Sequence, residues 1–356
     1  MILTILFILL TGALLELISL RRDQSKLEYS FSTSAARVEP GEVFTADTTM
    51  VNHHLLPITY MDVRETFPAA VQFPEGLQAG ESEQHANTVV VSNVFRMGGR
   101  QRIRRSLPIS IEKRGKHLFF DAEAEVGDFL GFTQMEFHYP NYDEVLVYPR
   151  RLQSRPLTDA LGSFCGEMQA QQFLIRDPIL TIGVRDYTGH EPMRDIHWTQ
   201  TARKGSLMVR EFDYNRQLSA SVILSISEVS PAEPDRMDLC CSVARTVCET
   251  LTDQGVEIDF YTNGRVGRNA AAIWSCKVTP EKKGSLLEGL SILTGFAGCS
   301  TDHLLQMVSR ENNMDTAYIV ISSELDTKAA AAVAMIHKRT GVETMHLLAE
   351  DWKEEA

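Results

Sequence analysis

The sequence predicts a chain with three parts: an apolar amino-terminal helix, a β-sandwich, and an α/β domain built on a mostly parallel, doubly wound sheet. Three observations support this fold class. An apolar run opens the chain, hydrophobic residues then alternate with a period near two, and strand-like segments later alternate with helical ones. At 356 residues the chain is long enough for two folded domains.

The amino terminus is strongly apolar. Residues 1–20 contain Glu16 as their one charged side chain, and Arg21 and Arg22 follow directly. A helix of this length spans roughly 30 Å, about the thickness of the hydrocarbon layer. A cleaved signal, which is the alternative, carries its basic residues before the apolar run. We therefore expect a retained single-pass transmembrane anchor over residues 1–22. The positive-inside rule then places the soluble domains in the cytoplasm, at the cell membrane.

Residues 27–149 are expected to form the β-sandwich, because apolar residues alternate there and turn residues such as Pro40-Gly41 and Gly98-Gly99 separate the runs. About seven short strands at this spacing are typical of such a domain. The expected strands are Leu27–Ser34, Val43–Val51, Ile58–Thr66, Thr88–Phe95, Arg102–Ile111, Leu118–Glu125 and Glu144–Tyr148.

Residues 219–356 are expected to form the α/β domain, and residues 150–218 a linker and a signature segment leading into it. Apolar strand-like runs alternate there with longer helical patterns, which favours parallel strands. The expected strands are Ser221–Ser227, Val256–Tyr261, Ala317–Ser322 and Glu343–Leu348. The expected helices are Arg236–Gln254, Gly284–Ala297, Thr301–Arg310 and Thr327–Thr340.

Composition narrows the possible functions. The net charge of −12 argues against nucleic acid as a partner, since phosphate binding needs a basic face. None of the six cysteines lies in a C-x-x-C pair, which fits a reducing compartment. The motifs of phosphate-binding loops, dinucleotide sites, zinc proteases and serine hydrolases do not occur. A hydrolase using Cys165 with a distant histidine is the remaining catalytic alternative, and we expect that the chain is not an enzyme.

The segment from Arg185 to Asp213 is unusually dense in arginine, acidic and aromatic residues. Its spacing resembles the signature of the bacterial domain-of-unknown-function 58 family, although His190 stands where that family usually has an acid. The residues in register are Arg185, Tyr187, Gly189, Arg194, Ile196, Trp198, Ala202, Arg203, Gly205, Leu207 and Val209. The candidate interaction residues are Arg185, Tyr187, Gly189, Arg194, Trp198, Arg203 and Arg210.

The resemblance implies a membrane anchor, an immunoglobulin-like sandwich and a von Willebrand factor type A-like domain, working beside a MoxR-type AAA+ ATPase. That type of domain often holds a divalent cation in an Asp-x-Ser-x-Ser loop. The corresponding loop here, with Ser225 or Ser227 in the lead position, has no Asp. Hydroxyl groups alone bind Mg²⁺ weakly, so no metal or other cofactor is expected. Further oxygen ligands at the same rim could come from Glu228, Ser322, Ser323, Glu324 and Asp326.

Two interpretations of the signature segment follow. In the first, its arginines pair with Asp186, Asp195 and Glu211, and Trp198 packs between the two domains as a strut. In the second, arginine and aromatic groups form an exposed surface for a protein partner. The sequence thus predicts an uncharacterised membrane-anchored interaction or adaptor protein that works with the ATPase in an envelope-associated complex. The alternatives are a cell-envelope hydrolase and a metal-dependent ligand-binding domain.

Overall fold

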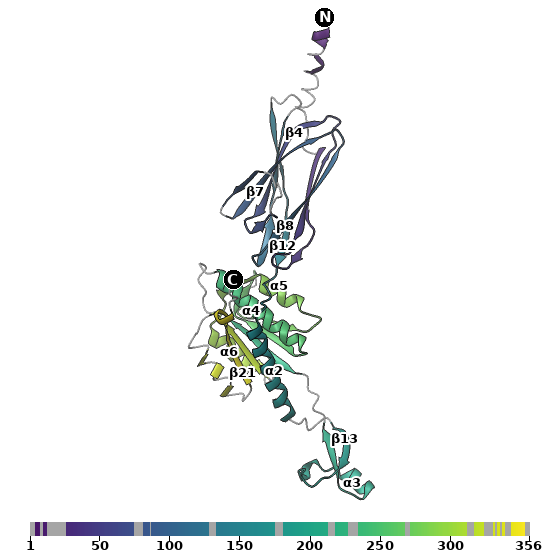
Figure 1. The fold of residues 1–356 in the computed structure, drawn as a ribbon, viewed down its shortest axis with the longest axis vertical. Coiled ribbons are helices and arrows are strands. Elements are labelled where there is room, and N and C mark those ends of the chain that lie inside the picture. Colours follow the sequence, from purple (N-terminus) through teal and green to yellow (C-terminus); the bar gives the residue numbers. More distant parts are fainter. Residues whose placement is uncertain are drawn as a thin grey trace. The chain divides into compact units, whose positions relative to one another are not determined.

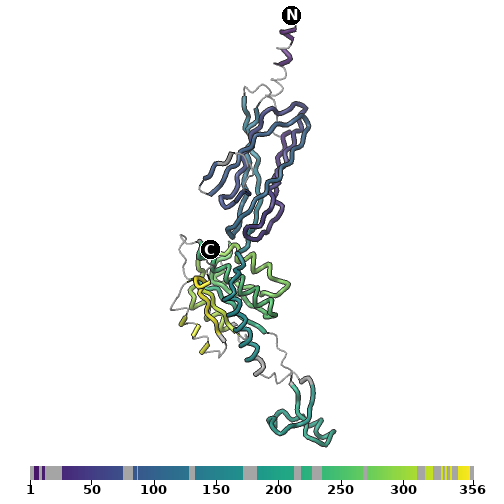
Figure 2. The backbone as a smooth tube through the Cα atoms, viewed as in Figure 1, coloured from purple at the N-terminus to yellow at the C-terminus, as the bar shows by residue number. Residues whose placement is uncertain are grey.

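A computed structural model describes residues 4–7, 10–12, 26–74, 81–85, 87–127, 133–174, 181–212, 218–226, 234–267, 271–311, 317–323, 330–331, 333–334, 337–338 and 343–352. The chain divides into two compact units, which are described separately below (Figures 1 and 2). Unit 1 is Met1–Arg150 with Leu290–Ile292, and unit 2 is Arg151–Gly289 with Leu293–Ala356.

Unit 1 is a β-sandwich. One sheet has the order β1-β3-β8-β5, formed by Leu27–Thr33, Phe44–Asn52, Arg102–Ile111 and Val71–Gln72. The facing sheet has the order β11-β10-β4-β7-β6, formed by Gln134–Tyr139, Ala122–Gly127, Ile58–Pro68, Thr88–Met97 and Glu81–Gln84. A third sheet, β2-β12-β9, consists of Arg37–Val38, Asp143–Val147 and Gly115–Phe119.

The sandwich encloses its core between inward-facing residues of both large sheets. Strand β3 alternates strictly between buried and half-buried positions, as a strand with one face on a core should. Met50 of β3 packs with Met61 and Val63 of β4, and Phe67 packs edge-on against Phe119 with ring centroids 6.0 Å apart. The core also holds a buried polar group. Glu65 accepts a hydrogen bond from Tyr29 at 3.0 Å and forms an ion pair with Arg105 at 3.4 Å.

Unit 2 contains a five-stranded mixed sheet with the order β18-β16-β15-β20-β21. Strands β16, β15, β20 and β21 are parallel, and β18 is antiparallel at the edge. They comprise Trp274–Val278, Glu257–Thr262, Ser219–Ser225, Ala317–Ser322 and Glu343–Leu348. Two separate antiparallel pairs accompany it: β13 (Thr181–Asp186) with β14 (Met208–Phe212), and β17 (Gly264–Val266) with β19 (Leu293–Ala297).

Two long helices of unit 2, α2 (Arg155–Leu174) and α4 (Pro234–Asp253), bury apolar side chains. Helix α4 packs against strands of the five-stranded sheet, and helix α2 packs on α4. The Thr246 hydroxyl on α4 accepts a hydrogen bond from the Leu152 amide at 2.9 Å, just before α2 begins. The other helices are α3 (Trp198–Lys204), α5 (Gly284–Ser291), α6 (Thr301–Glu311) and the 3₁₀ turns η2 (Met193–Asp195) and η3 (Ala349–Trp352).

The predicted fold class is wrong with respect to the membrane helix and the second domain. Within the described part of the chain, no helix is long and apolar enough to cross a membrane. Of the predicted anchor over residues 1–22, the structure describes residues 4–7 and 10–12, and the remaining positions lie outside the described residues. The expected doubly wound, von Willebrand factor type A-like sheet is also overturned. The observed sheet is mixed, two further antiparallel pairs accompany it, and more of the described residues lie in strands than in helices.

Individual elements also differ from the sequence prediction. The expected strand Leu118–Glu125 is two strands, β9 and β10, because β9 pairs with β12 whereas β10 pairs with β4 and β11. The expected helix Gly284–Ala297 ends at Ser291, and the remainder pairs with β17 as β19. Residues 155–174 lie within the predicted linker and signature segment, but they form the 20-residue helix α2. Most of the expected helix Thr327–Thr340 lies outside the described residues.

Candidate functional site

The signature segment is built on an antiparallel hairpin, and we call residues 181–212 the signature module. Strands β13 and β14 pair from Asp186 opposite Met208 to Thr181 opposite Phe212. The Tyr187 amide donates to the Leu207 carbonyl at 2.9 Å, and the His197 amide donates to the Met208 carbonyl at 2.8 Å. These bonds tie the intervening turns to the hairpin, so the backbone of the module is held by its own atoms.

Helix α3 begins and ends with local signals in the sequence. The His197 side chain caps the amino terminus, where its Nδ1 accepts a hydrogen bond from the Gln200 amide at 3.2 Å. Gly205 ends the helix with φ 75°, a left-handed conformation that glycine adopts without strain. The Thr201 hydroxyl accepts from the Met208 amide at 3.0 Å and joins the helix to β14. Gly205 therefore separates the helix from strand β14.

Glu191 is the best-connected acid of the module. Its carboxylate accepts from the Thr188 hydroxyl at 2.8 Å and the Thr188 amide at 3.0 Å, and it pairs with Arg185 at 2.6 Å. These hydrogen bonds, those from Thr188 first, lower the pKa of Glu191 to about 2. The carboxylate is therefore charged at every physiological pH, and it fixes the turn between β13 and η2.

The predicted interaction residues of the module are mostly exposed. The Trp198 side chain is 60% exposed and that of Arg194 is 86% exposed. Arg185, Arg203 and Arg210 are also exposed, while Tyr187 is half-buried. Gly189 has φ 96°, which explains a glycine at this turn. Ile196, Met208 and Val209 are buried and form the small apolar centre of the module.

The ion pairs differ from those expected for a strut. Arg185 pairs with Glu191, and Lys204 pairs with Asp186 at 3.0 Å. Arg194 approaches Asp195 only to 3.8 Å. Sequence reasoning missed Glu191 and Lys204, although the Thr188-x-x-Glu191 spacing is that of a capping box and signals a local hydrogen-bonded turn. It also missed Met193, a large apolar side chain that remains exposed, as does that of the signature residue Leu207.

The carboxyl ends of the parallel strands carry buried hydroxyl groups. Ser225 lies 2.7 Å from the Thr301 hydroxyl, and Ser322 lies 2.9 Å from Nε2 of His346. Burial lowers the pKa of His346, which favours its neutral form. Ser227, Glu228, Glu324 and Asp326 lie outside the described residues. The residues that can be described include no group of three or more His, Cys, Asp or Glu side chains able to hold a metal ion.

Cys165, the candidate nucleophile of a hydrolase, is buried on α2. Burial raises the pKa of its thiol. A cysteine nucleophile needs the opposite environment, because only the thiolate attacks and a lowered pKa supplies it.

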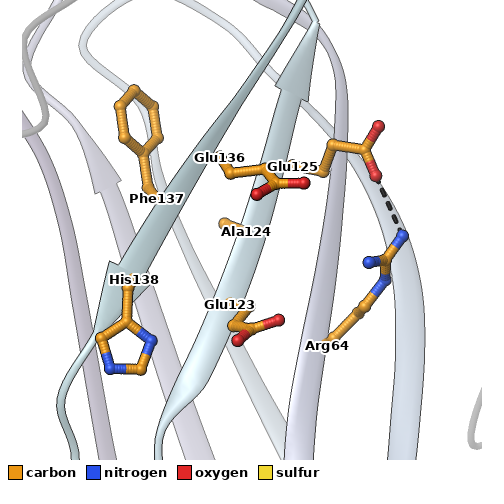
Figure 3. A pocket seen from close by; sticks show the side chains of 7 residues that line it. All are labelled: Arg64, Glu123, Ala124, Glu125, Glu136, Phe137 and His138. Atoms are coloured by element: carbon orange, nitrogen blue, oxygen red, sulfur yellow. Dashed lines mark hydrogen bonds and ion pairs between the residues drawn. The ribbon is translucent and has the colours of Figure 1, made fainter.

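A shallow pocket lies on the outer face of the five-stranded sheet in unit 1. It is lined by residues of β4, β10 and β11, whose side chains Figure 3 shows: Arg64, Glu123, Ala124, Glu125, Glu136, Phe137 and His138. Arg64 pairs with Glu125 at 2.9 Å and with Asp62 at 3.3 Å. His138 lies 3.3 Å from Asp121. This face is thus rich in carboxylates. Arg64 offsets the negative charge of two acidic side chains, Glu125 and Asp62.

No protein-family model matches the chain, and no curated protein matches it either. Among solved structures, a cohesin module from a Clostridium perfringens family 33 glycoside hydrolase is 13% identical, with a TM-score of 0.26, and covers 34% of this chain and 96% of that one. A non-cellulosomal cohesin from Archaeoglobus fulgidus is 10% identical (TM-score 0.22; 32% and 90% covered). A type II cohesin domain from the Acetivibrio cellulolyticus cellulosome is 8% identical (TM-score 0.24; 34% and 95% covered). TM-scores this low carry no argument about function.

Proposed function

We propose that this chain is a protein-interaction protein and that its signature module supplies the contact with the partner. The observation that carries the proposal is the exposure of Trp198, at 60%, in a module whose arginines Arg194, Arg203 and Arg210 are exposed as well. Tryptophan and arginine are the residue types most often found at the energetic centre of protein interfaces. A large apolar ring costs free energy in water, and a partner that covered it would recover that cost.

The construction of the module supports the same proposal. Trp198 is the first residue of α3, and His197 directly before it caps that helix. Gly205 closes the helix, and the Met208 amide bonds to Thr201 of the same helix. A backbone held in this way lowers the entropy lost on binding, because the anchor is already positioned before the partner arrives.

The resemblance to the domain-of-unknown-function 58 family suggests the identity of the partner. Members of that family work beside MoxR-type AAA+ ATPases, so we propose such an ATPase as the partner and an adaptor or client role for this chain. Attachment to an envelope-associated complex and a position on the cytoplasmic side stay predictions.

The test is capture of a MoxR-type AAA+ ATPase. The full chain is immobilised, and its affinity for the purified ATPase is compared with those of the Trp198→Ala and Arg194→Ala variants. Each variant should bind at least about tenfold more weakly, equivalent to about 1.4 kcal/mol, while its melting temperature stays within a few degrees of the parent. Phe296→Ala is the matched control, because Phe296 is an aromatic residue of unit 2 with a similar exposure of 58%.

Two results would contradict the proposal. Equal capture by the parent and by Trp198→Ala would remove the module from the interface. A large fall in the melting temperature of Trp198→Ala would instead favour the strut interpretation, since a fully buried tryptophan contributes roughly 3–5 kcal/mol to stability.

A further inference from the structure

The acidic side chains of the signature module are held mainly by the module itself. The Glu191 side chain is only 8% exposed and is bonded to Thr188 and Arg185. Asp195 is buried. Asp186 is exposed but pairs with Lys204 at 3.0 Å. Glu211 is exposed on β14 and lies beside Gly183. Glu191 and Asp195 are therefore withdrawn from a partner and Asp186 is paired, which leaves Glu211 as the exposed acid for which the described residues give no ion pair.

Three arginines of the module are exposed to solvent and are weakly paired or form no ion pair within the described residues. Arg194 is 86% exposed, and its nearest carboxylate oxygen is 3.8 Å away, at the limit of an ion pair. Arg203 and Arg210 are exposed, and within the described residues neither forms an ion pair. A chain with a net charge of −12 thus carries three exposed arginines within the signature module, which also presents the exposed Trp198.

We infer that the signature module recognises an acidic protein surface; this inference rests on the proposed function. Planar guanidinium groups match carboxylates in geometry and can bind them through two parallel hydrogen bonds. Trp198 would add the apolar contact at the centre of such an interface. The charge complementarity supplies orientation and speeds association.

An acidic protein fits this module better than nucleic acid does. A phosphate backbone requires a continuous basic face that meets one negative charge after another. In the signature module the exposed acids Asp186 and Glu211 interrupt the positive groups. A few carboxylates on a folded partner can avoid those two positions, whereas a regular polyanion cannot.

The experiment measures binding of labelled peptides to the full chain by fluorescence anisotropy. The first probe contains eight glutamates flanked by leucine and tyrosine residues, and the second has glutamine in place of every glutamate. The glutamate peptide should bind, and raising the salt from about 50 to 200 mM should weaken it several-fold, because the contact is electrostatic. Arg203→Glu and Arg210→Glu should each weaken it at least fivefold. Arg102→Glu is the matched control, since Arg102 is an exposed arginine of the sandwich, and it should leave binding unchanged.

Equal binding of the two peptides, or binding of neither, overturns the inference. So does tighter binding of a DNA duplex or of phosphatidylglycerol vesicles that depends on the same arginines. The proposed function is judged separately. Capture of the ATPase that needs Trp198 but is insensitive to salt and to Arg203→Glu would leave that function standing and remove only the acidic partner surface.

Discussion

The carboxamide of Asn263 forms a closed pair of hydrogen bonds with the backbone of Ile226. Its Oδ1 accepts from the Ile226 amide at 2.8 Å, and its Nδ2 donates to the Ile226 carbonyl at 2.9 Å. The same Nδ2 donates to the Cys299 carbonyl at 2.9 Å. One fully buried side chain therefore joins the ends of β15 and β16 to the loop before α6. Without it, three backbone groups would lose their partner inside the unit.

We expect Asn263→Ala to lower the free energy of unfolding by about 3 kcal/mol or more, because buried unsatisfied groups cost roughly 1–3 kcal/mol each. Asn263→Asp should cost at least as much, since a carboxylate keeps the acceptor, loses both donors and buries a charge. Urea denaturation of unit 2 measures both. A loss below about 1 kcal/mol in Asn263→Ala would show that water replaces the side chain.

Substitution of Gly289 by a residue with a side chain is expected to destabilise unit 2. A Cβ at this position would overlap the indole ring of Trp274, whereas a Cβ at Gly284, in the same helix α5, meets nothing within 4 Å. Gly289→Ala should therefore destabilise unit 2 by roughly 1–3 kcal/mol through overpacking. Gly284→Ala is the control, and it should be neutral or slightly stabilising, since alanine restricts the unfolded chain. Equal melting temperatures for the two variants would contradict this expectation.

The Tyr29 hydroxyl should remain protonated in alkaline solution until the sandwich unfolds. Burial, and then the charge of Glu65, raise the pKa of Tyr29 well above its ordinary value of 10.0. Because the folded-state pKa exceeds the unfolded one, the stabilisation is complete below about pH 10 and is lost as the pH rises further. Absorbance titration of tyrosinate, with Tyr29→Phe to identify the signal, measures this. A reversible ionisation of Tyr29 near pH 10 in the folded protein would refute it.

His346 should make unit 2 less stable in mild acid. Burial lowers its pKa below the ordinary 6.5, so the unfolded chain takes up a proton more readily than the folded one. The stabilisation is present above about pH 6.5 and decreases as the pH falls towards the folded-state pKa. His346→Gln, which keeps a hydrogen-bonding group near Ser322, should flatten this dependence in chemical denaturation between about pH 7 and 5. An unchanged slope would assign the dependence to other groups.

Glu191 should titrate far below an ordinary glutamate. Its folded-state pKa is about 2, against an ordinary 4.5, so its stabilisation of the signature module is present above about pH 4.5 and lost as the pH falls through about 2. Thr188→Val removes the largest cause of the shift and should raise the pKa. Thr199→Val is the control. Carboxyl chemical shifts followed by NMR report the pKa, and a value near 4.5 in the parent protein would disprove the Thr188–Glu191 contact.

The sequence revealed the sandwich more fully than the α/β unit. Strict alternation identified β3 because one face meets the core and the other does not. Helix α2 was missed, although Leu157, Leu161, Cys165 and Met168 recur at helical spacing and are all buried. Because the signature segment that follows α2 is dense in charged and aromatic residues, the prediction treated residues 150–218 together as a linker and signature segment. Strand β19 could not be separated from α5, because a five-residue strand acquires its conformation from the partner β17, which is distant in sequence.

The candidate site was located by its composition, but its internal arrangement was not. The exposure of Trp198 depends on the turns around it. The identities of the neighbouring residues do not predict whether its ring faces solvent. The Thr188–Glu191 contact carried a readable signal, whereas the Lys204–Asp186 pair joins residues on α3 and β13. Pairs of that kind depend on how the hairpin folds back, which local spacing does not specify.

The pairing of Thr181 with Phe212 means that the chain enters and leaves the signature module through neighbouring strand ends. The module therefore has the geometry of an insertion, in which a short peptide could bridge the gap left by its removal at little entropic cost. Such a cassette can be lengthened, exchanged or lost without rebuilding the core of the unit that carries it. Recognition of a partner could then diverge among relatives while the sheet and the helices packed on it stay the same.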